Sequence, residues 1–532
     1  METTPYLAIQ SSANLVVLED GVIRNVPLDL KKEWSFGRAV PGNTPDVQMH
    51  SNIVSRQHGR FFLLDGDWYY RDEGSYNGTW FNGEKLKRES DNKSRAVKLK
   101  NGDVIRIDSE DLEIPDDRGV WILFSTESLS NQWKSVYLRK KETVFGRDPE
   151  ECDVCIPLPY VSARHVIFAK RADKYYVMDC DSMSGTWLNN QKVMGECLLH
   201  EKDHVAICDC LMVFTGNYVI YNVPKRKQEE PEPMETPVEK LAAEELPAVT
   251  AGSGEEITAE AAVSTDEAVW NNAPVIIKAD IESKIVPNSN GHGNVELLRD
   301  VHVQVREGSL VALLGGSGAG KTTVMNCMNG MDTRGVKGNV EFQGVDLLRN
   351  FERMKFLIGS VPQREVFHET LSVEKELHDA AVIRLPKDTK RKEINAHVDR
   401  TIHQLGLDAV RKNRISTCSG GEKKRVNIAI ELVADRQLLC LDEPDAALDP
   451  GMKRELFRIL RDLAHKEGKS ILVIIHDVSE IDLFDQIIMM AKVDNVGRLA
   501  FSGTPNEARK YFGREIKDAY ELLKKEPEKY VH

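Results

Sequence analysis

The chain has 532 residues, of which 29% are charged, and a formal net charge of −13. This length predicts about three domains, because a single hydrophobic core stops growing beyond roughly 250–300 residues. The acidic balance disfavours a nucleic-acid partner, which needs a basic face for the phosphate backbone. No stretch approaches the roughly 20 apolar residues that span a bilayer, and the first residues lack the pattern of a secretory signal. The nine cysteines show no spacing typical of a disulfide scaffold, so we expect a soluble protein of the reducing cytosol.

One pattern occurs twice in the first part of the chain. The first copy reads FGR at 36–38, VSRQH at 54–58 and YNGTWFN at 76–82, and the second reads FGR at 145–147, VSARH at 161–165 and MSGTWLN at 183–189. The offset of 107 to 109 residues indicates two copies of one domain. Short alternating runs between these landmarks are typical of strands and hairpins. We therefore predict two small all-β sandwiches, at residues 1–125 and 126–222.

An acidic segment follows the repeats. Residues 223–270 contain twelve acidic and four basic residues, so eight of the thirteen net negative charges lie there. Pro, Ala, Glu and Ser dominate, and no apolar period supports a core. We predict a disordered linker.

The remaining residues, 271–532, change to alternating strands and helices. Three short apolar runs, at 311–314, 437–441 and 471–475, read as buried strands, and each ends at polar or Gly-rich residues. A helical pattern runs from Met452 to Glu467 and stops at Gly468. Buried parallel strands with helical crossovers predict an α/β sheet that binds ligands at the carboxyl ends of its strands.

A glycine-rich motif follows the first of these strands. Residues 315–322 read GGSGAGKT, which matches G-x-x-x-x-G-K-[ST] between a strand and a helix. Backbone amides of such a loop surround a phosphate, and the helix N-terminus adds its positive dipole end. Lys321 is then placed for the β- and γ-phosphates, and the Thr322 hydroxyl is placed for Mg²⁺. The motif predicts an ATP site.

Two carboxylates end the second strand. Asp442 suits the Mg²⁺ shell, and Glu443 suits a carboxylate that polarises the attacking water near the γ-phosphate. Because Pro444 follows, Glu443 also has a plain structural interpretation as an acidic residue at a helix N-terminus.

Further motifs in this part of the chain resemble those of ABC ATPases, over nearly all of residues 272–532. CSGGE at 418–422 lies 23 residues before Asp442, counted from Ser419, and resembles the signature motif, which caps the γ-phosphate of the opposite protomer in that family. Gln363 looks like the Q-loop, ALD at 447–449 like the D-loop, and His476 like the switch histidine. The segment SGGEKKRVNIAIEL at 419–432 is similar to the corresponding segment of the G subfamily, whose fold includes an inserted helical subdomain.

The resemblance implies specific residue roles. The expected nucleotide-binding residues are Gly315, Gly316, Ser317, Gly318, Ala319, Gly320, Lys321, Thr322, Thr323, Ser419, Gly420, Gly421 and Asp449. The expected catalytic residues are Glu443, His476, Lys321 and Gln363, and the expected Mg²⁺ ligands are Thr322, Gln363 and Asp442. The sequence departs from the family at Glu422, at Cys418 and at 283–286, where SKIV replaces the aromatic residue that stacks on adenine in many members.

The N-terminal repeats resemble forkhead-associated (FHA) domains, which bind phosphothreonine. That chemistry needs a fixed guanidinium, a hydroxyl donor and an amide for the peptide backbone. In the first copy Arg38, Ser55 and Asn77 fit these roles, with Arg56 adding charge, while His58 is expected to brace the loop. The second copy keeps Arg147, Ser162 and His165 but has Ser184 in place of the asparagine, so binding there is an open alternative to a purely structural sandwich. Cys152 and Cys155 have the spacing of half a zinc site, although small packed thiols are the favoured interpretation.

The resemblances predict an ATP- and Mg²⁺-dependent ATPase subunit of a G-like ABC exporter, working as a homodimer of ATPase domains. The expected partners are an ABC-2-like permease on a separate polypeptide, a Ser/Thr kinase, and a phosphothreonine protein or the chain's own phosphorylated linker. The expected location is the cytoplasm, with the chain held at the inner face of the cell membrane through the permease. The alternative is a soluble ABC ATPase that remodels a cytosolic complex recruited through phosphopeptide binding.

Overall fold

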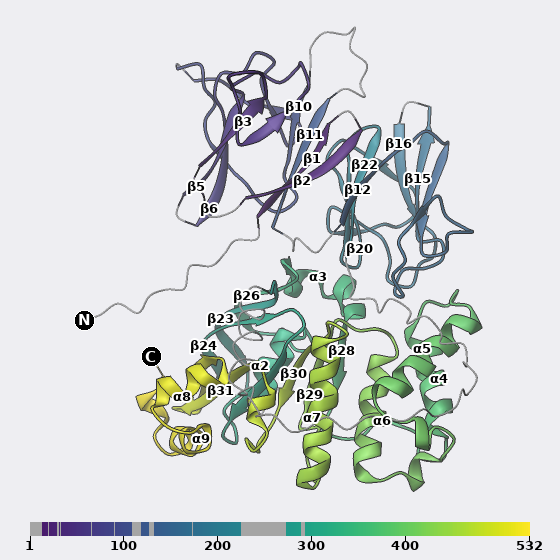
Figure 1. Cartoon of the computed structure of the whole chain (residues 1–532), viewed down its shortest axis with the longest axis vertical. Coiled ribbons are helices and arrows are strands. Elements are labelled where there is room, and N and C mark those ends of the chain that lie inside the picture. Colours follow the sequence, from purple (N-terminus) through teal and green to yellow (C-terminus); the bar gives the residue numbers. More distant parts are fainter. Residues whose placement is uncertain are drawn as a thin grey trace, which may run out of the picture.

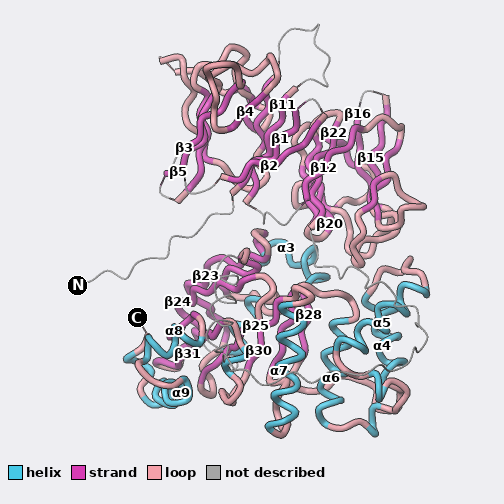
Figure 2. Tube along the Cα trace, in the orientation of Figure 1, coloured by secondary structure: helices cyan, strands magenta, loops and turns pink. Residues whose placement is uncertain are grey.

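A computed structural model of the chain describes residues 13–224, with gaps at 20, 29–30, 32, 65, 90, 109–118, 127–131 and 173, and residues 273–531, with a gap at 289–292. Two all-β domains lie side by side above a larger α/β domain (Figure 1). Strands dominate the upper half, and most of the helices lie in the lower half (Figure 2). The predicted acidic linker, apart from Val223 and Pro224, falls outside the described residues.

The first β domain consists of a six-stranded sheet in the order β2-β1-β11-β10-β7-β8 and a five-stranded sheet in the order β4-β3-β5-β6-β9. The strands of the first sheet are β1 Asn14–Glu19, β2 Val22–Pro27, β7 Trp80–Phe81, β8 Glu84–Lys85, β10 Val104–Ile107 and β11 Val120–Ser125. Those of the second are β3 Glu33–Arg38, β4 Val47–Met49, β5 Gly59–Leu64, β6 Asp67–Asp72 and β9 Val97–Lys98. The predicted sandwich is thus confirmed.

The second β domain also has a six-stranded and a five-stranded sheet, ordered β12-β22-β21-β20-β17-β18 and β14-β13-β15-β16-β19. Its connectivity differs at one strand, because the place that β1 takes in the first domain is taken here by β22, the last strand of the domain. The strands of its first sheet are β12 Gln132–Tyr137, β17 Trp187–Leu188, β18 Gln191–Lys192, β20 His204–Ile207, β21 Cys210–Phe214 and β22 Tyr218–Val223. Those of its second are β13 Glu142–Gly146, β14 Val154–Cys155, β15 Val166–Arg171, β16 Lys174–Asp179 and β19 Cys197–Leu199.

The two β domains share an apolar interface. In β1, Leu15 and Val17 pack in the core of the first domain, whereas Val16 and Leu18 belong to a separate buried cluster that includes Trp133 of the second domain. Because both faces of β1 are covered, its sequence is a continuous apolar run rather than an alternating one.

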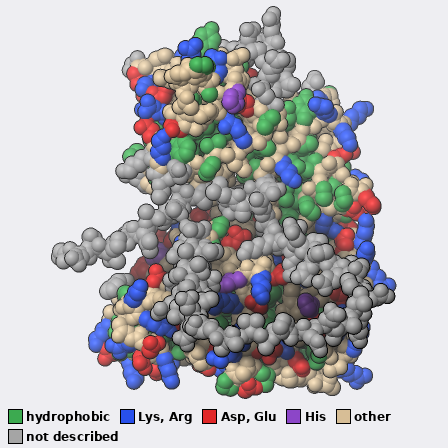
Figure 3. Space-filling view, viewed as in Figure 1, with side chains coloured by type: hydrophobic (Ala, Val, Ile, Leu, Met, Phe, Trp, Pro, Cys, Tyr) green, Lys and Arg blue, Asp and Glu red, His purple; other side chains and the backbone are tan. Residues whose placement is uncertain are grey.

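The α/β domain is built on a ten-stranded mixed sheet in the order β27-β26-β23-β24-β32-β31-β25-β30-β29-β28. Its strands are β23 Val275–Pro287, β24 Asn294–Arg306, β25 Leu310–Gly315, β26 Val336–Phe342, β27 Val345–Asp346, β28 Ile358–Val361, β29 Leu438–Asp442, β30 Ser470–Ile474, β31 Gln486–Val493 and β32 Val496–Gly503. The strands from β31 to β28 pair in parallel, and β25 is buried along its whole length, as its apolar run predicts. On the face in Figure 3, acidic and basic side chains are interspersed along the edge of this domain.

Eight α-helices of the described residues belong to this domain. They are α2 Lys321–Met328, α3 Leu347–Met354, α4 Val373–Arg384, α5 Arg391–Gln404, α6 Gly420–Leu432, α7 Pro450–His465, α8 Pro505–Phe512 and α9 Ile516–Lys525. Helices α4, α5 and α6 lie between β28 and β29 in the chain and form a group at one side of the sheet (Figure 1), here named the helical subdomain. Within the described ranges, no helix is long and apolar enough to cross a membrane.

Candidate functional site

The predicted ATP-site residues lie at one edge of the parallel sheet. Strands β25, β30, β29 and β28 are neighbours in this order and run in parallel, so their carboxyl ends meet at the same edge. The glycine-rich loop follows β25, His476 follows β30, Asp442 and Glu443 end β29, and Gln363 follows β28. Motifs that lie between residues 315 and 476 of the sequence are thereby brought together at one edge of the sheet.

The glycine-rich loop surrounds the side chain of its own lysine, Lys321. Lys321 is 8% exposed, and its Nζ donates to the carbonyl oxygens of Gly315 at 2.9 Å and Gly316 at 3.2 Å. Burial lowers the pKa of Lys321, an effect that Glu443 and Asp442 oppose. Gly320, the N-cap of α2, has φ +85°, a left-handed conformation that glycine adopts at little cost. Ser317 and Gly318 are exposed and Thr323 is half-buried, whereas Ala319 is buried.

The expected metal ligands lie beside this loop. Thr322 Oγ1 is 3.4 Å from Asp442 Oδ2, so a hydroxyl and a carboxylate oxygen meet at the start of α2. Burial and the neighbouring Glu443 raise the pKa of Asp442, an effect that a bound divalent cation would oppose. Oxygen ligands of this kind suit Mg²⁺, whose other ligands at nucleotide sites are phosphate oxygens and water.

Glu443 is held from two sides. Gln363 Nε2 donates to its Oε2 at 2.7 Å, and His476 Nε2 lies 2.6 Å from its Oε1. The backbone of Glu443 has φ +51°, a conformation that costs a non-glycine residue about 1–2 kcal/mol. The alternative interpretation of Glu443 as a helix N-terminal residue receives no support, because the next helix, α7, starts only at Pro450.

Of the remaining predicted nucleotide residues, Ser419 and Asp449 cap helices, and Gly420 and Gly421 lie in the first turn of α6. Ser419 is the N-cap of α6, where its hydroxyl accepts from Glu422 N at 3.3 Å and the Glu422 carboxylate accepts from Ser419 N at 2.7 Å. Asp449 caps α7 and accepts from Met452 N at 3.0 Å. Among the described residues, no recorded hydrogen bond or ion pair joins Ser419 or Asp449 to the glycine-rich loop. This end of α6 instead packs on α7, since an added Cβ on Gly421 would meet Met452 Sδ at 2.9 Å.

Three residues near the loop escaped the sequence analysis. Tyr520 of α9 donates to the Gly315 carbonyl at 3.0 Å, Lys524 lies 3.7 Å from a Cβ built on Gly316, and Lys492 lies 3.4 Å from one built on Gly318. None belongs to a motif, so only the three-dimensional fold identifies them. Lys284 lies in the segment 283–286, where many ABC ATPases have the aromatic residue that stacks on adenine. Its side chain is fully buried and donates to the carbonyls of Asp332 and Arg334.

In the first β domain, the predicted phosphothreonine residues converge on one face. Arg38 donates to Asn52 Oδ1 at 2.7 Å, Ser55 Oγ accepts from Tyr76 N at 2.9 Å, and Asn77 Nδ2 donates to the Ile53 carbonyl at 2.7 Å. Tyr76 is 91% exposed, and Arg56 is also exposed, so the face is open.

Gly37 and His58 explain the local fold of this face. A Cβ on Gly37 would lie 2.2 Å from the Arg56 carbonyl, so only glycine lets the loop with Ser55 cross beside Arg38. His58 is buried and accepts from Ser55 N through Nδ1 at 3.1 Å, as a loop brace.

The second β domain repeats the framework but not the open face. Ser162 Oγ accepts from Met183 N at 3.2 Å, and His165 accepts from Ser162 N at 3.1 Å. Ser184 Oγ is buried and has no hydrogen-bond partner among the described residues, unlike Asn77 of the first copy. Arg147 pairs with Glu393 and Asp388 of the helical subdomain.

The two cysteines with zinc-like spacing make local contacts. Cys152 Sγ donates to the Gly146 carbonyl at 3.4 Å and Cys155 Sγ donates to the Arg147 carbonyl at 3.2 Å. Burial and Cys155 raise the pKa of Cys152 to about 11, so this thiol stays protonated. Within the described residues, no group of three or more His, Cys, Asp or Glu side chains is placed to hold a metal ion.

Family comparisons agree with the motifs. Residues 298–446 match the family model described as ABC transporter, and residues 34–108 and 143–208 each match the FHA domain. The ABC transporter ATP-binding/permease protein Rv1747 of Mycobacterium tuberculosis is 35% identical over 215 residues, which cover 40% of this chain and 24% of that protein. ABC transporter G family member 26 of Arabidopsis thaliana is 34% identical over 239 residues, which cover 43% of this chain and 34% of that protein.

The matched region is therefore only part of each relative. The chain spans about a quarter to a third of the length of these curated proteins. Among solved structures, cbiO1 from Clostridium perfringens, part of the ABC transporter complex cbiONQ, is 26% identical; the match covers 47% of this chain and 99% of that one, with a TM-score of 0.38.

Proposed function

We propose, from the premise that this chain carries an ABC-type ATPase domain and two FHA domains, that it is the ATP-hydrolysing subunit of a G-like ABC exporter whose permease is a separate polypeptide. The observation that carries the ATPase assignment is the position of Glu443 between Gln363 and His476, next to the Thr322–Asp442 pair.

Each of the predicted site residues has a separate role in phosphoryl transfer. Glu443 orients and polarises the attacking water, and Gln363 and His476 fix its carboxylate by hydrogen bonds. Lys321 supplies a positive charge to the phosphate oxygens after exchanging the loop carbonyls for them. Thr322 and Asp442, with Gln363, would hold the divalent cation. Bound Mg²⁺ and ATP supply the transferable phosphoryl group and the cation that neutralises its charge.

Glu443→Gln tests this assignment. The amide keeps the size of the side chain but loses the negative charge that orients water, so we expect turnover to fall at least about a hundredfold while ATP still binds. Glu352→Gln is a matched control, because Glu352 is 66% exposed on α3 and pairs with Lys355 rather than with a predicted site residue. Unchanged turnover in Glu443→Gln would remove the assignment.

A partner surface supports the permease proposal. Val366, Val382 and Ile383 are 63%, 49% and 75% exposed, although all three are apolar. Val366 N donates to Asn427 of α6, and Arg384, next to Ile383, pairs with Glu431 one turn further along the same helix. Apolar side chains gathered beside one helix are typical of a protein interface.

Membrane recruitment tests this surface. If it binds a permease, Ile383→Glu should reduce the fraction of the protein that sediments with membranes of its source cells several-fold. Val22→Glu is the control, since Val22 is 66% exposed on β2 of the first FHA domain. Equal sedimentation of both variants and the wild type would favour the rival function, remodelling of a cytosolic complex.

We propose further that the first FHA domain binds phosphothreonine through Arg38 and Ser55, with Arg56 adding charge and Asn77 meeting the peptide backbone. The open face and the fixed guanidinium support this role.

A further inference from the structure

The corresponding faces of the two FHA domains differ in burial. In the first domain Ser55 is half-buried and Arg56 is exposed. In the second domain the equivalent residues, Ser162 and Ala163, are only 4% and 6% exposed. The same loop is therefore open in one copy and covered in the other.

The cover is the connection between α4 and α5 of the helical subdomain. Asp388 Oδ2 accepts a hydrogen bond of 2.7 Å from Ala163 N, and its Oδ1 lies 3.6 Å from Arg147 Nη2. Glu393, in the first turn of α5, accepts from Arg147 Nη1. The Arg147 side chain is 13% exposed beneath these two carboxylates. A segment more than 200 residues away in sequence thus lies on the FHA face.

These contacts have the chemistry of an anion-binding site. A guanidinium together with a backbone N–H binds carboxylate or phosphate oxygens through charge-assisted hydrogen bonds. Asp388 accepts from the Ala163 N–H and forms an ion pair with Arg147, and Glu393 accepts from Arg147 Nη1. The third nitrogen of the guanidinium, Nε, donates to the Val161 carbonyl of the FHA domain itself at 3.0 Å. A second ion pair has the opposite polarity, with the cation on the ATPase side: Lys390 pairs with Asp148 of the FHA domain at 2.7 Å.

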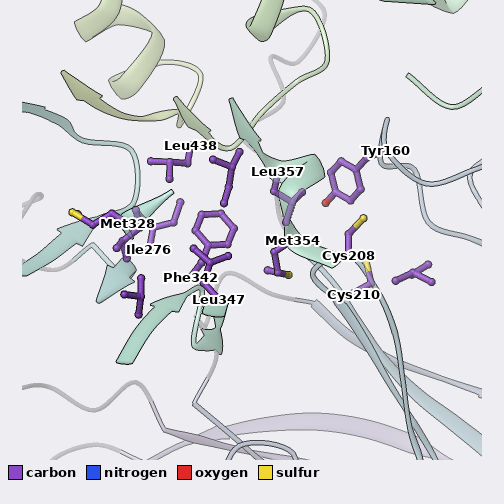
Figure 4. Close-up of a cluster of buried hydrophobic side chains, with 14 of the residues drawn as sticks. Tyr160, Cys208, Cys210, Ile276, Met328, Phe342, Leu347, Met354, Leu357 and Leu438 are labelled. Atoms are coloured by element: carbon purple, nitrogen blue, oxygen red, sulfur yellow. The ribbon is translucent and has the colours of Figure 1, made fainter. Parts of the chain in front are cut away.

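Apolar contacts join the second FHA domain to the other part of the ATPase. Tyr160, Cys208 and Cys210 belong to one continuous buried cluster with Met354 and Leu357, which precede β28 (Figure 4). The FHA domain therefore contacts both the sheet and the helical subdomain.

From these contacts we propose that the anion-binding face of the second FHA domain takes the segment Asp388 to Glu393 of this same chain as its ligand, through the carboxylates at the two ends of that segment, in place of a phosphothreonine peptide. The two carboxylates occupy the guanidinium and the amide that a phosphate would need. Docking in this way ties the helical subdomain, which carries Ser419 of the signature motif, to the sheet that carries the glycine-rich loop. The second FHA domain thus holds the helical subdomain and the sheet of the ATPase domain together, and the face of the first FHA domain remains free for phosphopeptides.

Amide hydrogen exchange of the full chain, without nucleotide or peptide, tests the docking. We expect peptides covering 159–166 and 386–394 to exchange at least about tenfold faster in Asp388→Ala/Glu393→Ala than in the wild type. Arg147→Ala should give the same result from the other side of the contact. Two controls should leave both regions unchanged: Arg38→Ala, the equivalent arginine of the open face, and Thr389→Val, whose hydroxyl has no partner among the described residues.

Two results would overturn the proposal. The first is unchanged exchange of 159–166 in Asp388→Ala/Glu393→Ala, a variant that alters only the ATPase side and so cannot unfold the FHA domain directly. The second is a phosphothreonine peptide that binds the Arg38→Ala chain and speeds exchange at 386–394, because the second face would then prefer phosphate. Both readouts are independent of ATP hydrolysis, so they stand apart from the fate of the proposed transporter function.

Discussion

Tyr520 of α9 donates a 3.0 Å hydrogen bond to the carbonyl of Gly315, the first residue of the glycine-rich loop. Lys321 donates to the same carbonyl at 2.9 Å, so the two side chains share one acceptor. Burial raises the pKa of Tyr520, and the Lys524 ammonium lies 4.0 Å from the centre of its ring. The helix α9 therefore supports the loop of the proposed ATP site.

Tyr520→Phe should weaken this support without removing any phosphate ligand. The lost hydrogen bond is worth about 1 kcal/mol, so we expect the Kd for ATP to rise about three- to tenfold. Titration of the full chain with Mg²⁺ and ATP measures this change. Tyr511→Phe is the control, because Tyr511 is 48% exposed and lies on α8. Equal affinity in both variants would contradict the role of Tyr520.

The parts of the ATP site that the sequence predicted are those encoded locally. A loop between a strand and a helix, or a carboxylate pair at a strand end, is recognisable because the few residues that make it are consecutive. Strand order then brings Gln363, Glu443 and His476 together, as expected. Tyr520 and Lys492 were missed because their proximity to the loop depends on how distant elements pack, which leaves no local pattern.

The same distinction holds for the FHA domains. Both sandwiches and the residues of both faces follow from short motifs, yet nothing near Arg147 predicts that it is covered. The cover comes from Asp388 and Glu393, which look like ordinary solvated charges in an exposed helical connection. The sequence therefore left open whether the second face binds phosphopeptide, and contacts between domains supply the new observation.

His58 should make the first FHA domain sensitive to acid. Burial, opposed by the charge of Asp72, lowers the pKa of His58 to about 4 from an ordinary value of 6.5. In the unfolded chain His58 therefore becomes protonated below pH 6.5, whereas in the folded domain it becomes protonated only below about pH 4. The free energy of unfolding should fall over this range, by up to about 3 kcal/mol, while the full stability remains above pH 6.5.

Pulse proteolysis in urea, at pH 7.5 and 4.5, measures this loss in the full chain. His58→Gln should be less stable at pH 7.5 but lose less on acidification, because glutamine does not titrate. His50→Gln should behave like the wild type, since His50 is exposed. A wild-type domain with the same urea midpoint at both pH values would contradict the prediction.

The first FHA face should bind phosphothreonine peptides from the acidic linker. Thr236, Thr250, Thr258 and Thr265 belong to this segment and lie outside the described residues. A site on the same chain is presented at roughly millimolar effective concentration, so even a weak motif would dock. We expect at least one of four phosphopeptides to bind the full chain in a fluorescence titration, and Arg38→Ala to abolish the binding.

Arg147→Ala serves as the comparison for the linker peptides and should retain the binding. If none of the four peptides binds while an unrelated phosphothreonine peptide does, the intramolecular switch is wrong and recruitment of another phosphoprotein is favoured. Binding that survives Arg38→Ala would place the site elsewhere.

The signature motif should form half of a composite ATP site between two copies of the ATPase domain. Ser419 and Gly420 are exposed, and a Cβ built on Gly420 meets no atom within 4 Å in the described structure. Gly420→Ala should therefore leave the monomer as stable as the wild type, since its backbone needs no left-handed conformation and its helix gains a better helix former. The absence of a side chain at this position is explained if a nucleotide bound by a second copy approaches it.

Light scattering of the Glu443→Gln background, with and without ATP, measures assembly through this surface. We expect ATP to produce a dimer, and both Ser419→Arg and Gly420→Ala to weaken it at least about tenfold. Ser419→Ala distinguishes a steric clash with the partner from the loss of the helix cap. It loses only the N-cap hydrogen bond from Glu422 N, worth about 1 kcal/mol, and adds no atom that would collide with a partner. Dimers that form equally well in Ser419→Arg, or a Glu443→Gln chain that stays monomeric with ATP, would show that this surface does not complete an ATP site in a second copy.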